Sequence, residues 1–307
     1  MPSISVVIPT YKRGPLLKNA ILSALQQSLP AIEIIVVDDN IEEKESQSVL
    51  DCIQSLDDPR IKLISNFRHK GGCGARNSGI LTAAGDYIAL LDDDDLLLPR
   101  ALEAHYNAFN EDTAMVYGNC QVVDELYHIT ETTSFGTDEL HFNDLIMGVC
   151  PPSSSVVMVT RTALVEAGLF DESLPSFQDY DMWLKIARQH SIRSHEGLVA
   201  KFIQHDGQRT SINFEKRRSG LELIVKKWNR EIQAVRPLKT FINHFMAGAY
   251  FSSGTVSLAL GAEHRMQAIR FFIKALRLKF FYRRYWKWTV FSLLGFEMTK
   301  KIRSIHP

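Results

Sequence analysis

The clearest chemical signal in this sequence is a run of four aspartates, Asp92 to Asp95, directly after the apolar residues 87–91. Residues 87–91 (YIALL) have the pattern of a buried strand. Adjacent carboxylates at a strand end repel one another unless a hard cation or a set of hydrogen-bond donors neutralises them. The run therefore predicts a divalent-cation site. The alternative is a solvated acidic turn that caps the following helix, and the apolar strand before the run argues against it.

Polar residues also follow two other predicted strands. Thr10 and Tyr11 come after residues 3–9, and Asp39 comes after residues 32–37. In open α/β sheets, ligands bind beyond the carboxyl ends of the strands. We therefore expect these side chains and the aspartate run to line one rim of a sheet.

A glycine-rich segment, KGGCGARN at residues 70–77, lies at the start of a predicted helix and contains Arg76. Backbone N–H groups and the helix dipole favour an anion at such a position. The segment matches neither GxGxxG nor a GK[ST] loop, so it supports neither hydride transfer nor P-loop hydrolysis. A flexible turn without a ligand explains the segment about as well.

Two further groups of residues are candidates for chemistry. Asp179 and Asp181 lie two residues apart at the start of a predicted helix, where capping by Asp179 is the common structural role. His205 and Asp206 follow a predicted strand and offer a possible metal ligand, although a single histidine at such a place is usually structural. Neither group assigns a function by itself.

The elements that must position these residues alternate along the first half of the chain. Strands are predicted at residues 3–9, 32–37, 61–65 and 87–91, and helices at 15–27, 42–56, 74–84 and 99–109. Alternation of this kind predicts an α/β protein with a mostly parallel sheet and helices on both faces. Residues 114–204 mix short strands with short helices, one of them at 138–147. The chain beyond is predicted to be helical, at 215–231, 238–260 and from 263 onward.

The composition limits the class of protein. Of the 307 residues, 45% are hydrophobic and 23% are charged, so the chain can bury a large core and is neither a disulfide scaffold nor mainly disordered. Its four cysteines show no paired spacing, which argues against a zinc site or a disulfide framework and favours a reducing cytosol. We expect neither a signal peptide nor a membrane-spanning helix, because no apolar run approaches about 18 residues.

The charges are divided unevenly along the chain. Residues 1–213 carry 16 basic and 30 acidic side chains, whereas residues 214–307 carry 19 basic and 5 acidic ones. A basic, aromatic tail is found in nucleic-acid-binding proteins, but an acidic body with a net charge of −14 argues against wrapping phosphates. We therefore expect no nucleic-acid partner.

Five ordered segments of the chain resemble family 2 glycosyltransferases. They are SVVIPTYKR (5–13), EIIVVDD (33–39), ARN (75–77), AAGDYIALLDDDD (83–95, followed by Pro99) and FDESLPSFQDYDMWLKIA (170–187). Their order and spacing agree over roughly residues 3–211. Five segments in order make a far more specific match than any one of them.

The resemblance implies a glycosyltransferase A fold with a Rossmann-like sheet, in which a nucleotide-sugar-binding half at residues 1–112 precedes an acceptor-binding half at 113–213. Beyond the resemblance, the residue pattern adds a C-terminal helical extension, a basic aromatic helical tail at 214–307. The implied reaction is a metal-dependent, inverting transfer of a sugar from a nucleotide sugar, commonly a UDP-sugar. The implied acceptor is a hydroxyl of a glycan, here a lipid-linked precursor of a bacterial surface polysaccharide.

The resemblance also implies roles for single residues. The donor-binding residues by motif position are Thr10, Tyr11, Asp39, Arg76 and Asp92. Asp94 matches the residue that binds Mn²⁺ or Mg²⁺ across the diphosphate, His205 is a possible further metal ligand, and Asp179 falls where the family places its catalytic base. The chemistry agrees with these roles, since a metal can neutralise the leaving diphosphate while a carboxylate takes the acceptor's proton.

The sequence departs from the family pattern at three positions. Lys12 stands where the family often has Asn, Asn40 begins a stretch where Gly-Ser-x-Asp is usual, and Gln178 replaces a frequent Glu before the base. Another enzyme class, the nucleotidyltransferases that make nucleotide sugars, also uses a glycine-rich loop and a metal carboxylate. Those enzymes usually carry the glycine-rich signature directly after the first strand, where this chain has PTYKR (residues 9–13).

The C-terminal tail is rich in aromatic and basic residues. Residues 271–296 contain ten aromatic side chains among six Lys and Arg. Helices of this composition settle at the headgroup boundary of a bilayer. We therefore expect a cytoplasmic protein that is peripheral on the inner face of the cell membrane. The alternative is that the aromatic residues pack on the catalytic domain or on a second subunit of a homo-oligomer.

Overall fold

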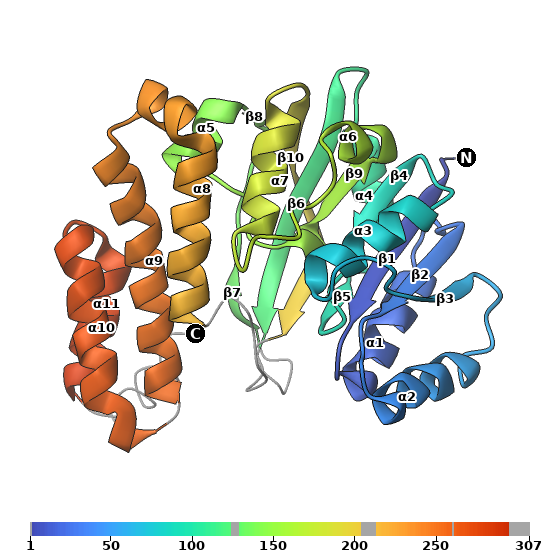
Figure 1. The fold of residues 1–307 in the computed structure, drawn as a ribbon, viewed down its shortest axis with the longest axis horizontal. Coiled ribbons are helices and arrows are strands. Elements are labelled where there is room, and N and C mark those ends of the chain that lie inside the picture. Colours follow the sequence, from blue (N-terminus) through green and yellow to red (C-terminus); the bar gives the residue numbers. More distant parts are fainter. Residues whose placement is uncertain (1, 124–128, 204–212, 260, 295–307) are drawn as a thin grey trace. The chain divides into compact units, whose positions relative to one another are not determined.

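The computed structural model describes residues 2–123, 129–203, 213–259 and 261–294 (Figure 1). The chain divides into two compact units. The first consists of Met1–Leu145, Cys150–Glu172 and Gln178–His205, and the second of Ile146–Val149, Ser173–Phe177 and Asp206–Pro307. Each unit is described by itself below.

The first unit is built on a mixed sheet. Its strands are β1 (Ile4–Thr10), β2 (Glu33–Asp38), β3 (Ile61–Ser65), β4 (Tyr87–Leu90), β5 (Asp95–Leu97), β6 (Thr113–Val123), β7 (Ile129–Thr132), β8 (Glu139–Leu140), β9 (Val157–Thr160) and β10 (Ser191–Ile203). Within the described ranges the sheet has ten strands, and eight of them follow the order β3-β2-β1-β4-β9-β6-β10-β5. β7 pairs with β6, and β8 pairs with β10.

Most of the sheet that precedes the aspartate run is parallel. β3, β2, β1 and β4 run parallel to one another, and β9 is antiparallel to both β4 and β6. β10 is parallel to β6 and antiparallel to β5. β1 and β2 are buried along most of their length, as expected for Val- and Ile-rich strands covered on both faces. The predicted mostly parallel α/β architecture is confirmed.

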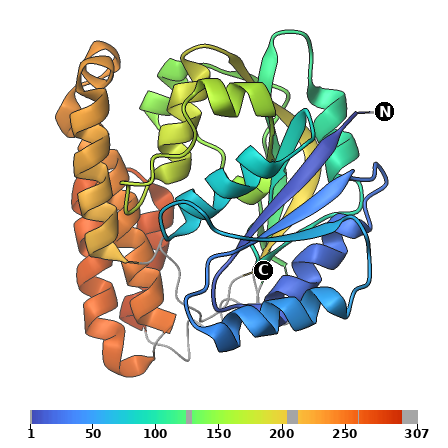
Figure 2. The ribbon, with the colours of Figure 1, turned by 45° about the vertical axis from the view of Figure 1, so that its right-hand side comes forward.

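Helices cover both faces of this sheet. Those before residue 204 are α1 (Gly14–Leu25), α2 (Glu43–Gln54), α3 (Gly72–Thr82), α4 (Ala101–Ala108), α5 (Phe142–Met147), α6 (Arg161–Glu166) and α7 (Gln178–Ala187), with a 3-10 turn, η1, at Ser154–Val156. The chain steps from β1 through β2 to β3 in one direction and returns to β4 in the other. Because such crossovers are right-handed, α1 and α2 cover one face and α3 covers the opposite one (Figure 2). The order reverses between β1 and β4, and ligands bind at such a switch point.

One predicted helix differs in the structure. The segment predicted to be helical at 138–147 begins with the short strand β8, which pairs with β10 through Leu140 and Glu139, and only then forms α5. The backbone bonds that β10 offers at this edge override the local helical pattern. Sequence periodicity alone does not carry this information.

Gly79 allows α3 to approach the sheet closely. A Cβ atom at this position would lie 2.4 Å from Val7 Cγ1 and 3.1 Å from Val37 Cγ2. Both valines are fully buried in β1 and β2, so neither has free space to move into. Because α3 also carries Arg76, the packing at Gly79 sets the position of a predicted site residue.

We predict that Gly79→Ala lowers the free energy of unfolding by about 1–3 kcal/mol, the usual cost of overpacking a filled core. Urea unfolding measures this change. Leu81→Ala is the matched control, because Leu81 lies on the exposed side of the same helix, and it should change stability by no more than about 0.5 kcal/mol. A Gly79→Ala protein as stable as the parent would show that α3 does not pack this closely.

α4 and β10 meet through two buried histidines. Nε2 of His195 lies 2.9 Å from Nδ1 of His105, and Nδ1 of His195 accepts a hydrogen bond of 3.1 Å from the backbone N–H of Gly197. In the neutral pair, His195 therefore carries its proton on Nε2 and donates it to His105. Burial lowers the pKa of His195 to about 4 and lowers the pKa of His105 well below its usual value.

The lowered pKa values predict that acid destabilises the fold. Below about pH 6.5 the histidines of the unfolded chain bind protons, whereas the buried pair in the folded protein stays neutral. The contribution of this pair to stability should therefore be complete above this pH. It should fall towards pH 4 by up to about 1.4 kcal/mol per histidine per pH unit. Urea unfolding at several pH values measures the slope. His105→Gln/His195→Asn should flatten the slope, whereas His141→Gln, which removes an exposed histidine, should not. Equal slopes in all three proteins would contradict this account.

The second unit is helical. It contains α8 (Phe214–Val235), α9 (Leu238–Ala259), α10 (Arg265–Leu278) and α11 (Arg283–Leu294), with a 3-10 turn, η3, at Ala262–His264. An apolar cluster joins α9, α10 and α11, with Phe251, Phe272 and Tyr285 among its buried members. The predicted C-terminal helical extension is confirmed, but the helix expected from residue 263 onward is interrupted at residues 279–282.

Candidate active site

Three carboxylates meet at the switch point between β1 and β4. Carboxylate oxygens of Asp92, Asp94 and Asp95 all lie within 4.8 Å of one another. The chain bends after β4, and the backbone N–H of Asp95 donates to the carbonyl of Asp92 at 3.1 Å. Three oxygen donors in this arrangement fit a hard divalent cation such as Mg²⁺ or Mn²⁺.

Asp95 belongs to this cluster because the strand does not continue through the aspartate run. If the strand continued, only alternate side chains would face one side, and Asp95 would lie apart from Asp92 and Asp94. Instead Asp93 and Asp94 form a turn, and Asp95 begins β5. Its carboxylate accepts hydrogen bonds from Ser155 Oγ at 2.6 Å and from the backbone N–H of Ile203 at 3.4 Å.

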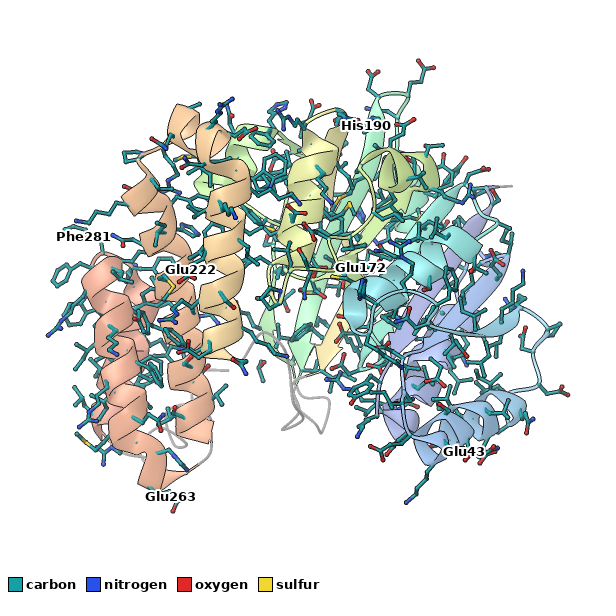
Figure 3. The ribbon with its side chains drawn as sticks, viewed as in Figure 1. Glu43, Glu172, His190, Glu222, Glu263 and Phe281 are labelled. Atoms are coloured by element: carbon teal, nitrogen blue, oxygen red, sulfur yellow. The ribbon has the colours of Figure 1, made fainter. Side chains whose placement is uncertain are left out.

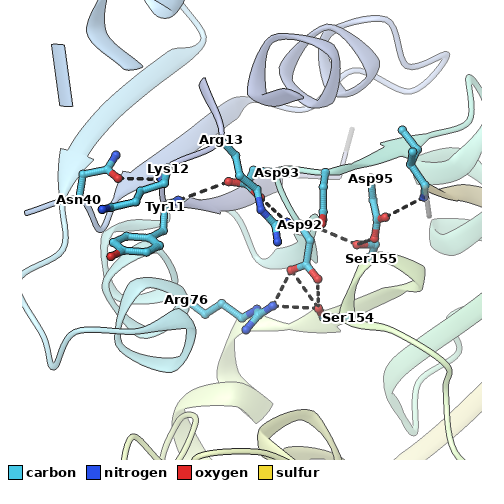
Figure 4. A network of polar contacts seen from close by, with 12 residues as sticks. Tyr11, Lys12, Arg13, Asn40, Arg76, Asp92, Asp93, Asp95, Ser154 and Ser155 are labelled. Atoms are coloured by element: carbon cyan, nitrogen blue, oxygen red, sulfur yellow. Dashed lines mark hydrogen bonds and ion pairs between the residues drawn. The ribbon is translucent and has the colours of Figure 1, made fainter. Parts of the chain in front are cut away.

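Arg13 offsets part of this negative charge. Its guanidinium forms ion pairs with Asp94 and, at 3.3 Å, with Asp93 (Figure 4). The chain turns back after β1 at Lys12, whose φ of 57° is left-handed and whose N–H donates to Asn40 Oδ1 at 2.8 Å. Burial raises the pKa of Asp93 to about 7, although Arg13 opposes this shift. Arg13 therefore places a positive charge of the protein at the site where a metal cation would bind.

Arg76 binds the first aspartate from the other side. Its Nη2 forms an ion pair of 2.5 Å with Asp92 and donates to Ser154 Oγ at 3.2 Å (Figure 4). Burial disfavours the charged guanidinium, but the carboxylates of Asp92 and Asp179 raise its pKa above the usual value. Arg76 thus remains a half-buried cation that interacts with both carboxylates.

The glycine-rich segment is tied to the end of β2. Asp39 accepts a hydrogen bond from the backbone N–H of Gly71 at 2.8 Å and another from Asn66 Nδ2 at 2.6 Å. Lys70 Nζ donates to the carbonyl of Asn40 at 2.7 Å. Asp39 therefore fixes the start of α3, whose next turn carries Arg76.

The remaining predicted donor residues lie on the same rim. Thr10 is buried at the end of β1, whereas Tyr11 is 47% exposed and its N–H donates to Asp93 at 3.3 Å. Direct contacts thus connect Tyr11, Asp93 and Arg13 to the aspartate cluster. The predicted metal ligand His205 lies outside the described residues.

Asp179 lies in the first turn of α7 and is half-buried. Its Oδ1 atom is shielded from solvent and has no hydrogen-bond partner among the residues that the structure describes. Burial raises the pKa of Asp179, Asp92 adds to this shift, and Arg76 opposes it. Asp181, two residues further on, is fully buried and pairs with Lys185 at 3.3 Å. The two carboxylates therefore have different environments.

Asn77 and Glu172 hold the segment before α7 against α3. Asn77 exchanges two hydrogen bonds of 2.9 Å with the backbone of Phe170, and its Nδ2 also donates to Glu172 at 2.8 Å. Glu172 accepts in addition from Arg68 Nε at 2.8 Å. The ARN motif thus has two functions, because Arg76 binds the aspartate cluster while Asn77 is structural.

The sequence interpretation assigned no role to three residues of the site, Arg13, Ser154 and Ser155, although the run that contains Arg13 was expected at the rim. A role for Arg13 could have been predicted, because this residue follows Thr10 and Tyr11 at the same rim of the sheet. The roles of the two serines could not, because they lie some 60 residues from the aspartates they contact, and a Ser-rich stretch is also typical of an ordinary loop.

Comparison with known families agrees with this geometry. The family model described as glycosyl transferase family 2 matches residues 5–164, more than half of the chain. The chain belongs to glycosyltransferase family 2. A model of glycosyl transferase family group 2 also matches, over residues 87–296. Family membership confirms the resemblance drawn from the five sequence segments.

Curated relatives of this family 2 chain include enzymes named for their substrates. An uncharacterized glycosyltransferase of Rickettsia bellii is 35% identical and covers 67% of this chain and 30% of its own length. The GalNAc(5)-diNAcBac-PP-undecaprenol beta-1,3-glucosyltransferase of Campylobacter jejuni is 34% identical over 64% of each chain. The chain spans only 30% to 66% of the length of the first curated relatives it matches.

Two solved structures show the fold. TarS 1–349 of S. aureus, solved with UDP-GlcNAc, matches with a TM-score of 0.60 and 17% identity, over 90% of this chain and 81% of that one. The mannosyltransferase PcManGT of Pyrobaculum calidifontis, solved with GDP-Man and Mn²⁺, matches with a TM-score of 0.57 and 17% identity. The match covers 95% of this chain and 84% of that one. The predicted glycosyltransferase A fold is confirmed. Among the described residues, no helix is long and apolar enough to cross a membrane.

We predict that Arg13→Gln tightens Mn²⁺ binding in the absence of nucleotide by about three- to tenfold, because the ion no longer competes with a guanidinium that is partly screened by solvent. Titration calorimetry or the electron paramagnetic resonance signal of free Mn²⁺ measures this. Lys12→Gln is the control, because Lys12 pairs with the exposed Glu42 and not with the aspartates. Weaker Mn²⁺ binding by Arg13→Gln would show that Arg13 supports the site.

Proposed function

We propose that this protein is a metal-dependent, inverting glycosyltransferase that moves a sugar from a UDP-sugar to a hydroxyl of a lipid-linked glycan precursor. The observation that carries the proposal is the gathering of Asp92, Asp94 and Asp95 at the switch point, where Arg76 forms an ion pair with Asp92 and also acts on the pKa of the half-buried Asp179. This arrangement provides a cation site, formed by the aspartates, and a proton acceptor, Asp179, in the same unit of the fold.

The substrate class is supported by relatives. The Campylobacter jejuni enzyme is named for a GalNAc(5)-diNAcBac-PP-undecaprenol acceptor, and WfgD of Escherichia coli, 27% identical, for UDP-Glc and alpha-D-GlcNAc-diphosphoundecaprenol. Both names describe a beta-1,3-glucosyl transfer to a polyprenyl diphosphate glycan. We carry this class over to the present chain, with UDP-glucose as the first donor to test.

On this proposal the nucleotide-sugar-binding half, residues 1–112, binds the donor. The residues that hold it are Thr10, Tyr11, Asp39, Arg76 and Asp92. Tyr11 is suited to contact a base because its ring is half exposed at the rim. Asp94, with Asp92 and Asp95 beside it, would hold Mg²⁺ or Mn²⁺, which when bound neutralises charge on the nucleoside diphosphate.

Residues 113–213 form the acceptor half on this proposal, and Asp179 takes the proton from the acceptor hydroxyl. The raised pKa of its carboxyl suits proton uptake near neutral pH. The bond from the hydroxyl oxygen to the anomeric carbon forms while the bond to the diphosphate oxygen breaks. A single displacement of this kind inverts the anomeric centre.

The tail, residues 214–307, would hold the protein peripherally on the inner face of the membrane. The alternative is that the tail forms the interface of a homo-oligomer.

We predict that Asp179→Asn keeps donor binding and lowers the turnover number at least about 100-fold, because Asn keeps the shape but cannot take a proton. Steady-state kinetics with a donor titration measure both effects. Asp181→Asn is the control in the same helix. This variant should be less stable, because it loses the ion pair with Lys185, but each folded molecule should retain its turnover. Near-normal turnover of Asp179→Asn would remove Asp179 from the role of base.

The reaction class is tested by the product that is released. A panel of nucleotide sugars with Mn²⁺ should give slow release of nucleoside diphosphate even without acceptor, and most with the true donor. Chelation should stop this release. Full activity in excess chelator would contradict the metal dependence. Release of pyrophosphate from a sugar phosphate and a nucleoside triphosphate would instead identify a nucleotidyltransferase.

A further inference from the structure

The turn that separates α10 from α11 exposes a group of aromatic side chains. We define the aromatic edge as Phe280, Phe281, Tyr282 and Trp286, whose exposed fractions are 57%, 93%, 46% and 43%. Figure 3 shows Phe281 at the outer end of these helices. Four large aromatic side chains exposed within seven residues form a contiguous apolar surface, and surfaces of this kind usually mark a binding site.

The aromatic edge is held in a fixed shape. Trp286 Nε1 donates a hydrogen bond of 2.7 Å to the carbonyl of Phe280. The ring centroid of Phe280 lies 5.2 Å from that of Trp286 and 5.4 Å from that of Phe281, both in edge-to-face geometry. Phe280 and Trp286 are therefore held together before any partner binds, which lowers the entropy cost of binding.

Other aromatic residues of the tail are already used inside the unit. Phe272 and Tyr285 are buried in the apolar cluster, and Trp288 packs against it. Their rings lie 5.0–6.1 Å from that of Phe251 in α9. Internal packing thus explains this set of residues but leaves the aromatic edge unexplained.

The charged side chains of α10, the turn and α11 are all of one sign. Residues 264–296 contain no Asp or Glu, and their basic residues are Arg265, Arg270, Lys274, Arg277, Lys279, Arg283, Arg284 and Lys287. Arg283 and Lys287 are exposed beside the edge. Aromatic rings at the headgroup boundary and cations among anionic headgroups are the two attractions by which peripheral helices bind membranes.

We infer that the aromatic edge inserts into the headgroup region of an anionic bilayer, with Arg283 and Lys287 contacting lipid phosphates. This inference deepens the membrane placement within the proposed function and rests on it. A neutral protein groove would not account for the uniform positive charge, so an anionic lipid surface is the partner that the residues fit.

The test uses the chain of 307 residues without truncation, because α8 packs against α9 and α9 against α10, so that truncation would expose a core. Vesicles of phosphatidylcholine with about a quarter phosphatidylglycerol are sedimented with the protein at low salt. The parent should bind, and salt or pure phosphatidylcholine should weaken binding. Phe280→Ser/Phe281→Ser should lower the partition coefficient at least about tenfold. Met266→Ser is the matched control, since Met266 is exposed at the other end of α10, about 18 Å from the turn, and it should bind like the parent.

A second readout locates the inserted residue. Lipids with brominated acyl chains should quench part of the tryptophan fluorescence. Trp286→Phe should remove most of that quenching, because Trp183 and Trp228 are buried and Trp288 is half-buried against the apolar cluster. Thermal unfolding confirms that each variant is folded.

Two results would overturn the inference. One is a double Phe variant that binds vesicles like the parent. The other is a parent that ignores anionic vesicles and a double variant that changes from oligomer to monomer in sedimentation, which would make the edge a subunit interface. Donor hydrolysis without vesicles tests the proposed function separately, so failure of either leaves the other result standing.

Discussion

Holding several carboxylates together at one end of a sheet is the constraint on which the site depends. Asp92, Asp94 and Asp95 lie close enough to share one ion, and their mutual repulsion in a partly buried site must be offset. Arg13 and Arg76 supply that offset from opposite sides. The hydroxyls of Ser154 and Ser155 in η1 and the backbone of β10 add neutral donors. The site is therefore a balance of charges, into which a divalent cation can enter only by competing with Arg13.

The rest of the fold can be understood as the means of placing these charges. The switch point brings the end of β1 next to the end of β4, so that Arg13 meets residues about 80 positions away. Gly79 lets α3 pack closely against β1 and β2, and this packing determines the position of Arg76. Asn77, one residue further, ties the same helix to the segment that leads into α7 and Asp179. A single helix thus couples the proposed cation site to the proposed base.

Much of this arrangement could be predicted from the sequence, for definite reasons. Apolar runs followed by polar residues located β1, β2, β3 and β4, and right-handed crossovers then determine the switch point. The place of Asp95 could not be predicted from strand geometry, because side chains alternate only while a strand continues and the chain turns at Asp93. The break at residues 279–282 was missed because its residues are aromatic and basic, without the Gly or Pro that mark turns. The shielding of Asp179 and the contacts of Ser154 depend on tertiary packing, which no local pattern encodes.

The central claim is that the clustered aspartates hold a divalent cation against the diphosphate of a nucleotide sugar. Electron–nuclear double resonance on Mn²⁺ in the presence of UDP tests this most directly, because it detects phosphorus nuclei bonded through oxygen to the metal. The account predicts a strong phosphorus coupling in the parent protein and its loss in Asp94→Ala. The same coupling in both proteins at equal UDP occupancy would contradict the account.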